Sequence, residues 1–273
     1  MTEFARCFLL VFGQLAAGGF FALSRLPFHD IERGFYKSSA CVFLASAGVI
    51  AGGQALLLGR GDTSAAAVVE VALWALFTLA GAVYVSTLWG DPYRRRALAY
   101  AATLASGLAA LIASALRHST APALSIETVL YPSSFLVSAL LLGATATGML
   151  LGHWYLIDVG MPLAPLVDVW RLYRTALLLQ IATLIVCLLG LALLGTAATA
   201  SAVADLWHQH RPLLWTRLGV GPIAALAIAW MIWRTLAIPQ TMAATGLFYV
   251  AVLATVVGEL LGRFLLFRTS LPL

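Results

Sequence analysis

The stretch that decides the fold is ALLLQIATLIVCLLGLALLG, residues 176–195. It contains no charged residue, and a helix of this length spans about 30 Å, the thickness of the hydrocarbon core of a bilayer. Similar runs recur along the chain, and we expect eight membrane-spanning helices near residues 7–25, 39–58, 65–89, 97–116, 129–156, 171–195, 213–236 and 240–267. The sequence therefore predicts an all-α fold: a single integral-membrane helix bundle of residues 1–273, with both termini on the same side.

The overall composition agrees with a membrane protein. The 273-residue chain is 62% hydrophobic and only 10% charged, whereas soluble domains carry about 25% charged residues. The net charge of +5 is the excess that the positive-inside bias produces in membrane proteins, so we expect no nucleic-acid partner. The composition excludes an ordinary soluble enzyme, a disordered chain and a disulfide scaffold, and the three cysteines show no paired spacing.

Glycine and proline mark the short connections between the spans. Residues 59–62 (GRGD), 90–92 (GDP) and 238–239 (IP) are typical helix stops, and residues 161–165 (MPLAP) cannot form a continuous helix because each proline lacks an N–H donor. These connections leave no room for a separate soluble domain. Two pairs of glycines lie four residues apart, at Gly148 and Gly152 and at Gly258 and Gly262, and predict close packing between helices.

The distribution of Lys and Arg predicts the orientation. Nine lie on one side of the expected bundle, namely Arg25, Arg33, Lys37, Arg94, Arg95, Arg96, Arg171, Arg174 and Arg234. Seven lie on the other, namely Arg6, Arg60, Arg117, Arg211, Arg217, Arg263 and Arg268. The side with nine is the expected cytoplasmic side, so both termini are expected outside a cytoplasmic (inner) membrane. We expect the first span to be a retained helix and not a cleaved signal peptide, because its apolar run is long.

Five polar residues are predicted at one depth, in the half of the bilayer nearer the termini. They are Gln14, Gln54, Glu70, Glu259 and Arg263. Polar side chains inside a membrane are expensive and tend to mark function, and this set has the hydrogen-bonding groups to hold a quinone carbonyl and pass protons. Two structural alternatives remain open: Glu259 and Arg263, four residues apart, form a simple ion pair, or the five residues are unrelated interfacial side chains.

The opposite side has its own polar residues. If the segment before the second span is helical, His29, Arg33 and Lys37 share a face, and with Arg94, Arg95 and Arg96 they are predicted to contact a lipid headgroup or acidic residues of a partner. His153, near the end of the fifth span, is a further candidate for quinone binding. We expect no haem, because a second histidine at the same depth within a span is missing.

The sequence contains no motif for a nucleotide, a metal or an iron–sulfur cluster. The pair His208 and His210 in an outer loop lacks a third ligand, so we expect both side chains to be solvated. We therefore predict no metal site. Any electrons must then come from or go to a partner protein.

Two stretches resemble a known family. Residues 11–20 (VFGQLAAGGF) are similar to the first helix, and residues 258–267 (GELLGRFLLF) to the last helix, of the DMSO-reductase anchor-subunit family. The resemblance implies an eight-span, haem-free, quinol-binding anchor that docks an iron–sulfur subunit and a molybdopterin-containing catalytic subunit, with the termini outside. Among the residues of this chain, the resemblance implies a part in quinol binding for Gln14, Glu259 and Arg263 only. Polysulfide-reductase-type anchors are a looser match.

These observations lead to one functional hypothesis and two rivals. We expect a membrane anchor subunit of a redox complex that binds quinone or quinol, either menaquinone or ubiquinone, and exchanges electrons with the iron–sulfur partner. Glu259 is the expected proton acceptor, with Arg263 setting its charge and Gln14, Gln54 and Glu70 completing the pocket. The rivals are a small-molecule transporter, which predicts a water-filled cavity between broken helices, and a non-catalytic scaffold or assembly protein.

Overall fold

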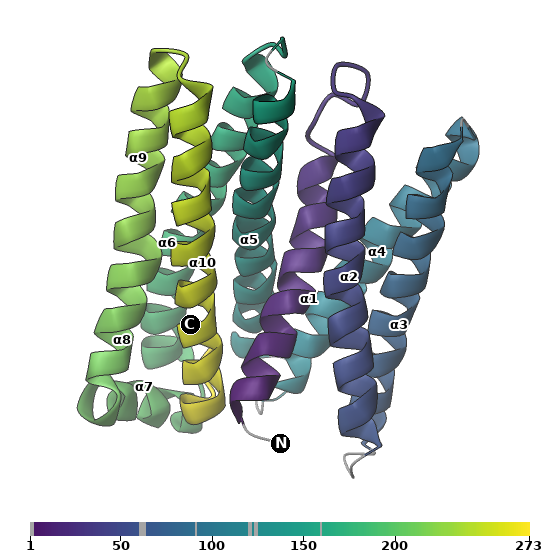
Figure 1. Cartoon of the computed structure of the whole chain (residues 1–273). Helices are drawn as coiled ribbons and strands as arrows, with labels where there is room; N and C mark the ends of the chain where they lie inside the picture. Colours follow the sequence, from purple (N-terminus) through teal and green to yellow (C-terminus); the bar gives the residue numbers. More distant parts are fainter. Residues whose placement is uncertain (1–2, 60–63, 91, 120–121, 123–124, 159) are drawn as a thin grey trace.

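The computed structural model describes residues 3–59, 64–90, 92–119, 122, 125–158 and 160–273. Within these ranges the chain is helical and contains no strand. Eight helices of this described part are long and apolar enough to cross a membrane, which confirms the predicted multi-pass helical bundle. Figure 1 shows the spans running alternately up and down, so that α1 begins and α10 ends at the same end of the molecule. We call this end the terminal end.

The spans have these bounds: α1 (Glu3–Leu23), α2 (Arg33–Leu58), α3 (Ala65–Ser86) with the 3-10 turn η1 (Thr87–Trp89), α4 (Tyr93–Arg117), α5 (Glu127–Ile157) and α6 (Ala164–Leu194). The seventh span combines α8 (Arg211–Leu218), the π-helical turn η2 (Gly219–Ile223) and α9 (Ala224–Ala237), and the eighth is α10 (Thr241–Thr269). The short helix α7 (Ala197–Gln209) lies at the terminal end between α6 and α8.

Helices α1 and α5 form the centre of the bundle, with α2 to α4 on one side and α6 to α10 on the other (Figure 1). In both, 72% of the most apolar window is buried, against 28% to 44% in the other spans of the described chain. Glycines let the two backbones touch: a Cβ atom on Gly18 would lie 1.7 Å from the carbonyl oxygen of Ala139, and one on Gly143 would lie 2.0 Å from the backbone of Gly18. Such small-residue contacts drive association where lipid removes the hydrophobic force between helices.

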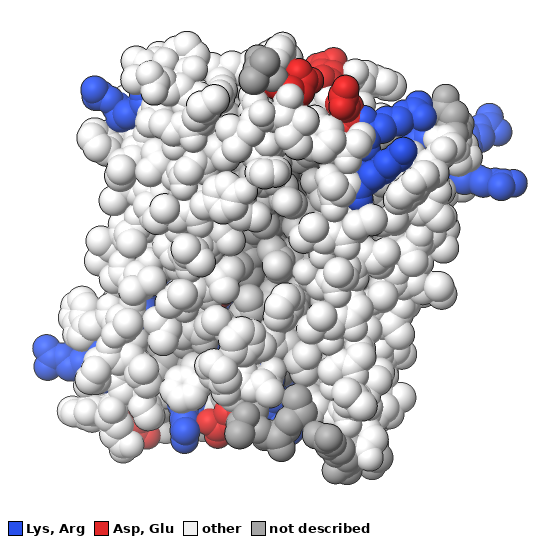
Figure 2. Space-filling view, viewed as in Figure 1, with Lys and Arg blue, Asp and Glu red and all other residues white. Residues whose placement is uncertain are grey.

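The outer surface suits a bilayer. On the face visible in Figure 2, charged side chains gather at the two ends and leave an uncharged band between them. Large apolar side chains within this part of the helices point outward, for example Leu79 on α3, Ile185 on α6 and Leu253 on α10. In water such a surface would drive aggregation, so its solvent is lipid.

Most predicted helix boundaries agree with the structure. Helix α9 ends just before Ile238 and Pro239, and Met161, Pro162 and Leu163 of the proline-rich segment lie between α5 and α6, whereas Ala164 and Pro165 already belong to α6. Residues 60–62 and 91, from two of the predicted stops, lie outside the described residues. Helix α6 begins at Ala164, earlier than predicted, because Pro165 lies in its first turn, where a missing N–H costs nothing. Helix α7 was not predicted.

The predicted glycine pairs serve close packing. A Cβ atom on Gly148 would lie 2.3 Å from the ring of Phe248, and one on Gly152 would lie 2.7 Å from Oγ1 of Thr245. Both contacts join α5 to α10. The second pair, Gly258 and Gly262, contacts Gly221 and the tail residue Leu273, which turns back after Ser270 and is buried.

Candidate functional site

The first polar cluster of the terminal end surrounds Glu70 on α3. Its carboxylate is fully buried and accepts hydrogen bonds from Nε2 of Gln54 on α2 at 3.2 Å and from Oγ of Ser114 on α4 at 2.5 Å. Arg117, at the end of α4, forms an ion pair with the second carboxylate oxygen. The indole N–H of Trp74 donates to Oγ of Ser114 at 2.9 Å. Side chains from three helices therefore meet at one buried carboxylate, which accepts two hydrogen bonds and forms an ion pair.

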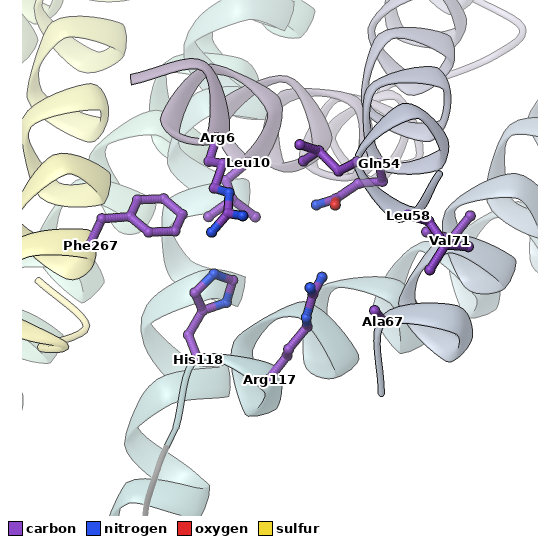
Figure 3. A pocket seen from close by; sticks show the side chains of 10 residues that line it. Arg6, Leu10, Gln54, Leu58, Ala67, Val71, Arg117, His118 and Phe267 are labelled. Atoms are coloured by element: carbon purple, nitrogen blue, oxygen red, sulfur yellow. The ribbon is translucent and has the colours of Figure 1, made fainter. Parts of the chain in front are cut away.

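A pocket of about 240 Å³ opens beside this cluster. Figure 3 shows Arg6, Gln54, Arg117 and His118 directed toward the same space, with Phe267 at one side. The remaining lining is aliphatic and comes from Leu10, Leu57, Leu58, Ala67 and Val71. The pocket thus has a polar, cationic wall and an apolar wall, an arrangement that suits a small ligand with polar oxygens on an apolar ring.

His118 is the titratable base of this pocket, and the sequence analysis did not identify it. Its Nδ1 lies 2.7 Å from the carbonyl oxygen of Ser114. Because a carbonyl only accepts, Nδ1 carries the hydrogen and Nε2 keeps its lone pair in the neutral ring. Burial lowers the pKa of His118 below its usual value, although the Ser114 carbonyl and the Glu70 carboxylate oppose this effect. His118 therefore favours the neutral, proton-accepting form.

The aromatic surroundings of His118 fix its ring. The ring centroid lies 5.3 Å from that of Phe267 on α10 and 6.1 Å from that of Phe135 on α5. His118 is the C-cap residue of α4, directly after Arg117. The only signal in the sequence was its place just past a predicted span end, and many interfacial residues share that place.

The second cluster surrounds Glu259 on α10, also fully buried. Arg263 Nη2 lies 3.4 Å from one carboxylate oxygen, so the predicted pair four residues apart is present. Arg217 Nη2 lies 2.7 Å from the other oxygen, and the sequence analysis missed this partner. Arg263 also donates to Oγ of Ser138 on α5 at 2.8 Å. Two buried guanidinium groups thus share one carboxylate, and this buried cluster carries net positive charge.

The interruption of the seventh span places Arg217. Pro222 cannot donate a backbone hydrogen bond, and around it the helix widens into the π-helical turn η2. At this turn Gly221 approaches Gly258 so closely that a Cβ atom on Gly258 would lie 2.8 Å from the Gly221 Cα. The close approach of α10 to η2 brings the Arg217 guanidinium onto Glu259.

Gln14 on α1 lies between the two clusters. Its Nε2 donates to the carbonyl oxygen of Phe135 at 3.3 Å. The ring of the same Phe135 contacts both His118 and Arg263. The five predicted residues therefore lie in the half of the bundle nearer the terminal end, but in two clusters: Gln54 and Glu70 in the first, Glu259 and Arg263 in the second, and Gln14 between them.

His153 lies at the opposite end of the bundle, away from both clusters. Its side chain is exposed, and its Nδ1 lies 3.2 Å from the hydroxyl of Tyr249 on α10. Helix α5 rises from the terminal end to this residue, so the structure does not bring His153 to the pocket.

The predicted contact residues also lie at the opposite end. Arg33 Nη1 and Arg96 Nη2 donate to the carbonyl oxygen of Gly90, at 3.4 and 2.9 Å, and Lys37 lies over the ring of Trp89. His29, Arg94 and Arg95 are exposed. The length of α4 separates Arg96 from Arg117 by about 30 Å, so these residues form a site of their own, which we call the basic rim.

Among the described residues, no three His, Cys, Asp or Glu side chains lie close enough to hold a metal ion. Comparison with known proteins returned no matching family model, no matching curated protein and no matching solved structure. The resemblance to the DMSO-reductase anchor subunits thus stays a prediction.

Proposed function

We propose that the protein is a quinone- or quinol-binding membrane subunit of an oxidoreductase complex, and that the pocket beside Glu70 receives the quinone ring. The observation that carries this proposal is a ring-sized pocket with arginine, glutamine and histidine on one wall of a membrane-embedded bundle. Pockets for drug-sized ligands measure about 300–1,000 Å³. The volume of about 240 Å³ therefore suits a single-ring head group better than a larger solute.

The residues of the pocket suit the two ends of such a ring. Arg6 and Arg117 supply N–H donors for a quinone oxygen, while Phe267 and the aliphatic wall cover the ring. Oxidation of a quinol releases two protons and two electrons: Nε2 of neutral His118 accepts one proton, water at the solvent-exposed Arg6 side of the pocket takes the other, and the partner protein takes both electrons. Glu70 does not line the pocket and acts as a positioning residue, because it holds Arg117 and Ser114.

This assignment moves the proton-accepting role from Glu259 to His118. Glu259 lies between Arg217 and Arg263 and does not line the pocket. Both of its carboxylate oxygens are already engaged by guanidinium groups, so neither oxygen is available to a ligand in the pocket. We assign to Glu259 the positioning of Arg263, whose guanidinium covers the ring of Phe135 beside His118.

The electrons require a partner protein, for which we propose an iron–sulfur subunit with a molybdopterin-containing catalytic subunit beyond it. Because electrons tunnel efficiently only over short distances, the iron–sulfur subunit would dock at the terminal end, next to the pocket. The basic rim is too far from the pocket for this contact, and it suits acidic lipid headgroups or acidic residues of another subunit.

Burial of arginines supports an orientation with the termini outside. Arg217 and Arg263 belong to the terminal half of the bundle, but both are buried inside it. They therefore do not count toward the positive charge at a membrane surface. Arg117 is held in its ion pair with Glu70. The exposed arginines of the opposite end include Arg25, Arg33, Arg94, Arg95, Arg171, Arg174 and Arg234. The positive-inside bias then favours the basic rim as the cytoplasmic side of the inner membrane.

Ligand binding to the purified protein in nanodiscs tests the proposal. We expect a quinone with a short tail to bind the wild-type protein. The His118→Gln variant should bind this quinone about tenfold more weakly, which corresponds to about 1.4 kcal/mol. His153→Gln is the matched control, since this histidine lies at the other end, and it should bind like wild type. Absence of quinone binding to wild type, or equal losses in both variants, would contradict the proposed pocket.

Purification from the native membrane tests the partner. Under the proposal, iron–sulfur and molybdenum subunits co-purify with the protein in mild detergent. Transport of a solute by the protein alone in liposomes would favour the transporter hypothesis instead, and a protein that binds no quinone and assembles with neither subunit would favour a scaffold.

A further inference from the structure

A second pocket, of about 420 Å³, lies between α1, α4 and α5. Its lining is almost entirely apolar and rich in small residues: Ala17, Gly18, Phe21, Gly107, Leu111 and Ala139 are among its walls. Leu108 at its edge is 48% exposed, so the pocket opens toward the lipid-facing surface of α4. We call it the apolar pocket, and the one beside Glu70 the polar pocket.

The two pockets lie along the same helix faces. On α1, Leu10 lines the polar pocket, and Ala17, seven residues later, lines the apolar pocket. On α4, His118 lines the polar pocket, and Leu111, seven residues earlier, lines the apolar pocket. Residues seven apart share a face of a helix and are separated by about 10 Å along its axis. The apolar pocket therefore lies one step deeper in the membrane, in line with the polar pocket.

Gln14 lies on the α1 face between these positions, four residues after Leu10 and three before Ala17. The side chain is completely buried, and its Oε1 has no hydrogen-bond partner among the described residues. A buried acceptor without a donor costs free energy, because the hydrogen bond that water would make is not replaced. An O–H donor on a ligand that lies between the two pockets would remove this cost.

We propose that the apolar pocket holds the hydrocarbon tail of the quinol whose ring occupies the polar pocket, with Gln14 beside the junction of ring and tail. The inference rests on the proposed function and specifies its substrate class: a quinol with a long apolar tail that reaches the site laterally from the bilayer between α4 and α5. Three observations point to this occupant: the alignment of the pockets, the opening toward lipid, and the orphan acceptor of Gln14.

The test compares two ligands and two matched variants in nanodiscs. The ligands share one quinone ring, and one carries a long isoprenoid tail while the other carries only a methyl group. Ala105 lines the apolar pocket and is exposed, so Ala105→Phe narrows the pocket without a clash in the core. Ala102, also exposed on α4 but outside the lining, provides the control Ala102→Phe. Leu108→Trp at the pocket edge is a second narrowing variant, and thermal unfolding checks that each variant folds.

We expect Ala105→Phe and Leu108→Trp to weaken binding of the long-tailed quinone by about tenfold and to leave binding of the methyl compound unchanged. Ala102→Phe should change neither. If the long-tailed quinone binds the narrowed variants as tightly as wild type, the tail lies elsewhere and the apolar pocket holds a lipid acyl chain. If wild type binds neither ligand, the proposed function itself fails, an outcome that differs from failure of the tail site alone.

Discussion

The guanidinium carbon of Arg263 lies 4.3 Å from the centroid of the Phe135 ring. The same ring lies 6.1 Å from the imidazole of His118, and the Phe135 carbonyl accepts the Nε2 hydrogen bond of Gln14. One residue of the central helix α5 therefore joins the buried Glu259 cluster to the polar pocket. A change in the Glu259 cluster is thus expected to reach the polar pocket through this ring.

Replacement of Phe135 by leucine should weaken this connection. The loss of the cation–π contact costs about 0.5–2 kcal/mol, and His118 loses one of its two aromatic neighbours. We expect a lower thermal unfolding midpoint in detergent and weaker quinone binding. Phe43→Leu is the control, since Phe43 is equally buried but packs against Phe20; it should lower the midpoint and leave binding unchanged. Equal quinone affinity in the two variants would show that Phe135 only fills space.

Replacement of Glu259 by glutamine should be the most destabilising single change of a polar residue at the terminal end. It leaves Arg217 and Arg263 buried without their carboxylate, and breaking a buried charge pair in this way costs about 3–5 kcal/mol. The expected result is a large fall in the thermal unfolding midpoint and in the yield of folded protein.

A double variant separates charge from packing in this cluster. Glu259→Gln with Arg217→Met restores the net charge that wild type buries, so its midpoint should lie above that of Glu259→Gln alone. A double variant less stable than both single variants would show that the two arginines stabilise the bundle by packing and not through the shared carboxylate.

Replacement of Glu70 by glutamine should cost less. The Arg117 side chain is 22% exposed, whereas both arginines of Glu259 are buried, so Arg117 can reach water when its partner is lost. We expect a loss of about 1–3 kcal/mol together with weaker quinone binding, because Arg117 is no longer held at the pocket. Thermal unfolding and binding in nanodiscs measure the two effects, and a Glu70→Gln variant less stable than Glu259→Gln would contradict this ranking.

The fold was predictable because hydrophobic runs of the right length leave little choice in a membrane. The span positions, the helix stops at the prolines and the partnership of Glu259 with Arg263 all follow from local spacing. Helix α7 escaped prediction because its 13 residues are neither long nor uniformly apolar. Thr196 begins it by accepting a hydrogen bond from the Thr199 N–H, a cap that the pattern of spans did not reveal.

The candidate site was only partly predictable because it depends on helix rotation and neighbours. The depth of Gln54 and Glu70 followed from their place in the spans. Their positions did not reveal that Ser114 and Arg117 of α4 contact the same Glu70 carboxylate. Arg217 looked like an interfacial residue because its burial depends on the π-helical turn η2. Only contacts between distant helices assign Arg217 to Glu259 and His118 to the pocket.

The contact between Gly221 and Gly258 gives a prediction with an internal control. A methyl group on Gly258 would lie 2.8 Å from the Cα of Gly221, so Gly258→Ala must push η2 away from α10 and loosen Arg217. We expect a loss of about 1–3 kcal/mol, as for other overpacked sites. Gly246 on the same helix faces open space, so Gly246→Ala should stabilise α10 by about 0.5–1 kcal/mol. The thermal unfolding midpoints of Gly258→Ala and Gly246→Ala test this prediction. Similar midpoints for the two variants would mean that the contact between Gly221 and Gly258 is not tight.

Acid should destabilise the protein through His118. Its pKa in the folded state is lowered by burial, while the unfolded chain keeps the ordinary value of about 6.5. Above about pH 6.5 the imidazole is neutral in both states, and below it the unfolded state takes up a proton that the folded state resists, so the free energy of unfolding falls as pH falls. The thermal midpoint of wild type should therefore drop between pH 7 and pH 5 more than that of His118→Gln. His153→Gln, which removes an exposed histidine, should keep the wild-type dependence. A pH dependence that survives in His118→Gln would assign the effect to another group and remove the argument for a neutral base in the pocket.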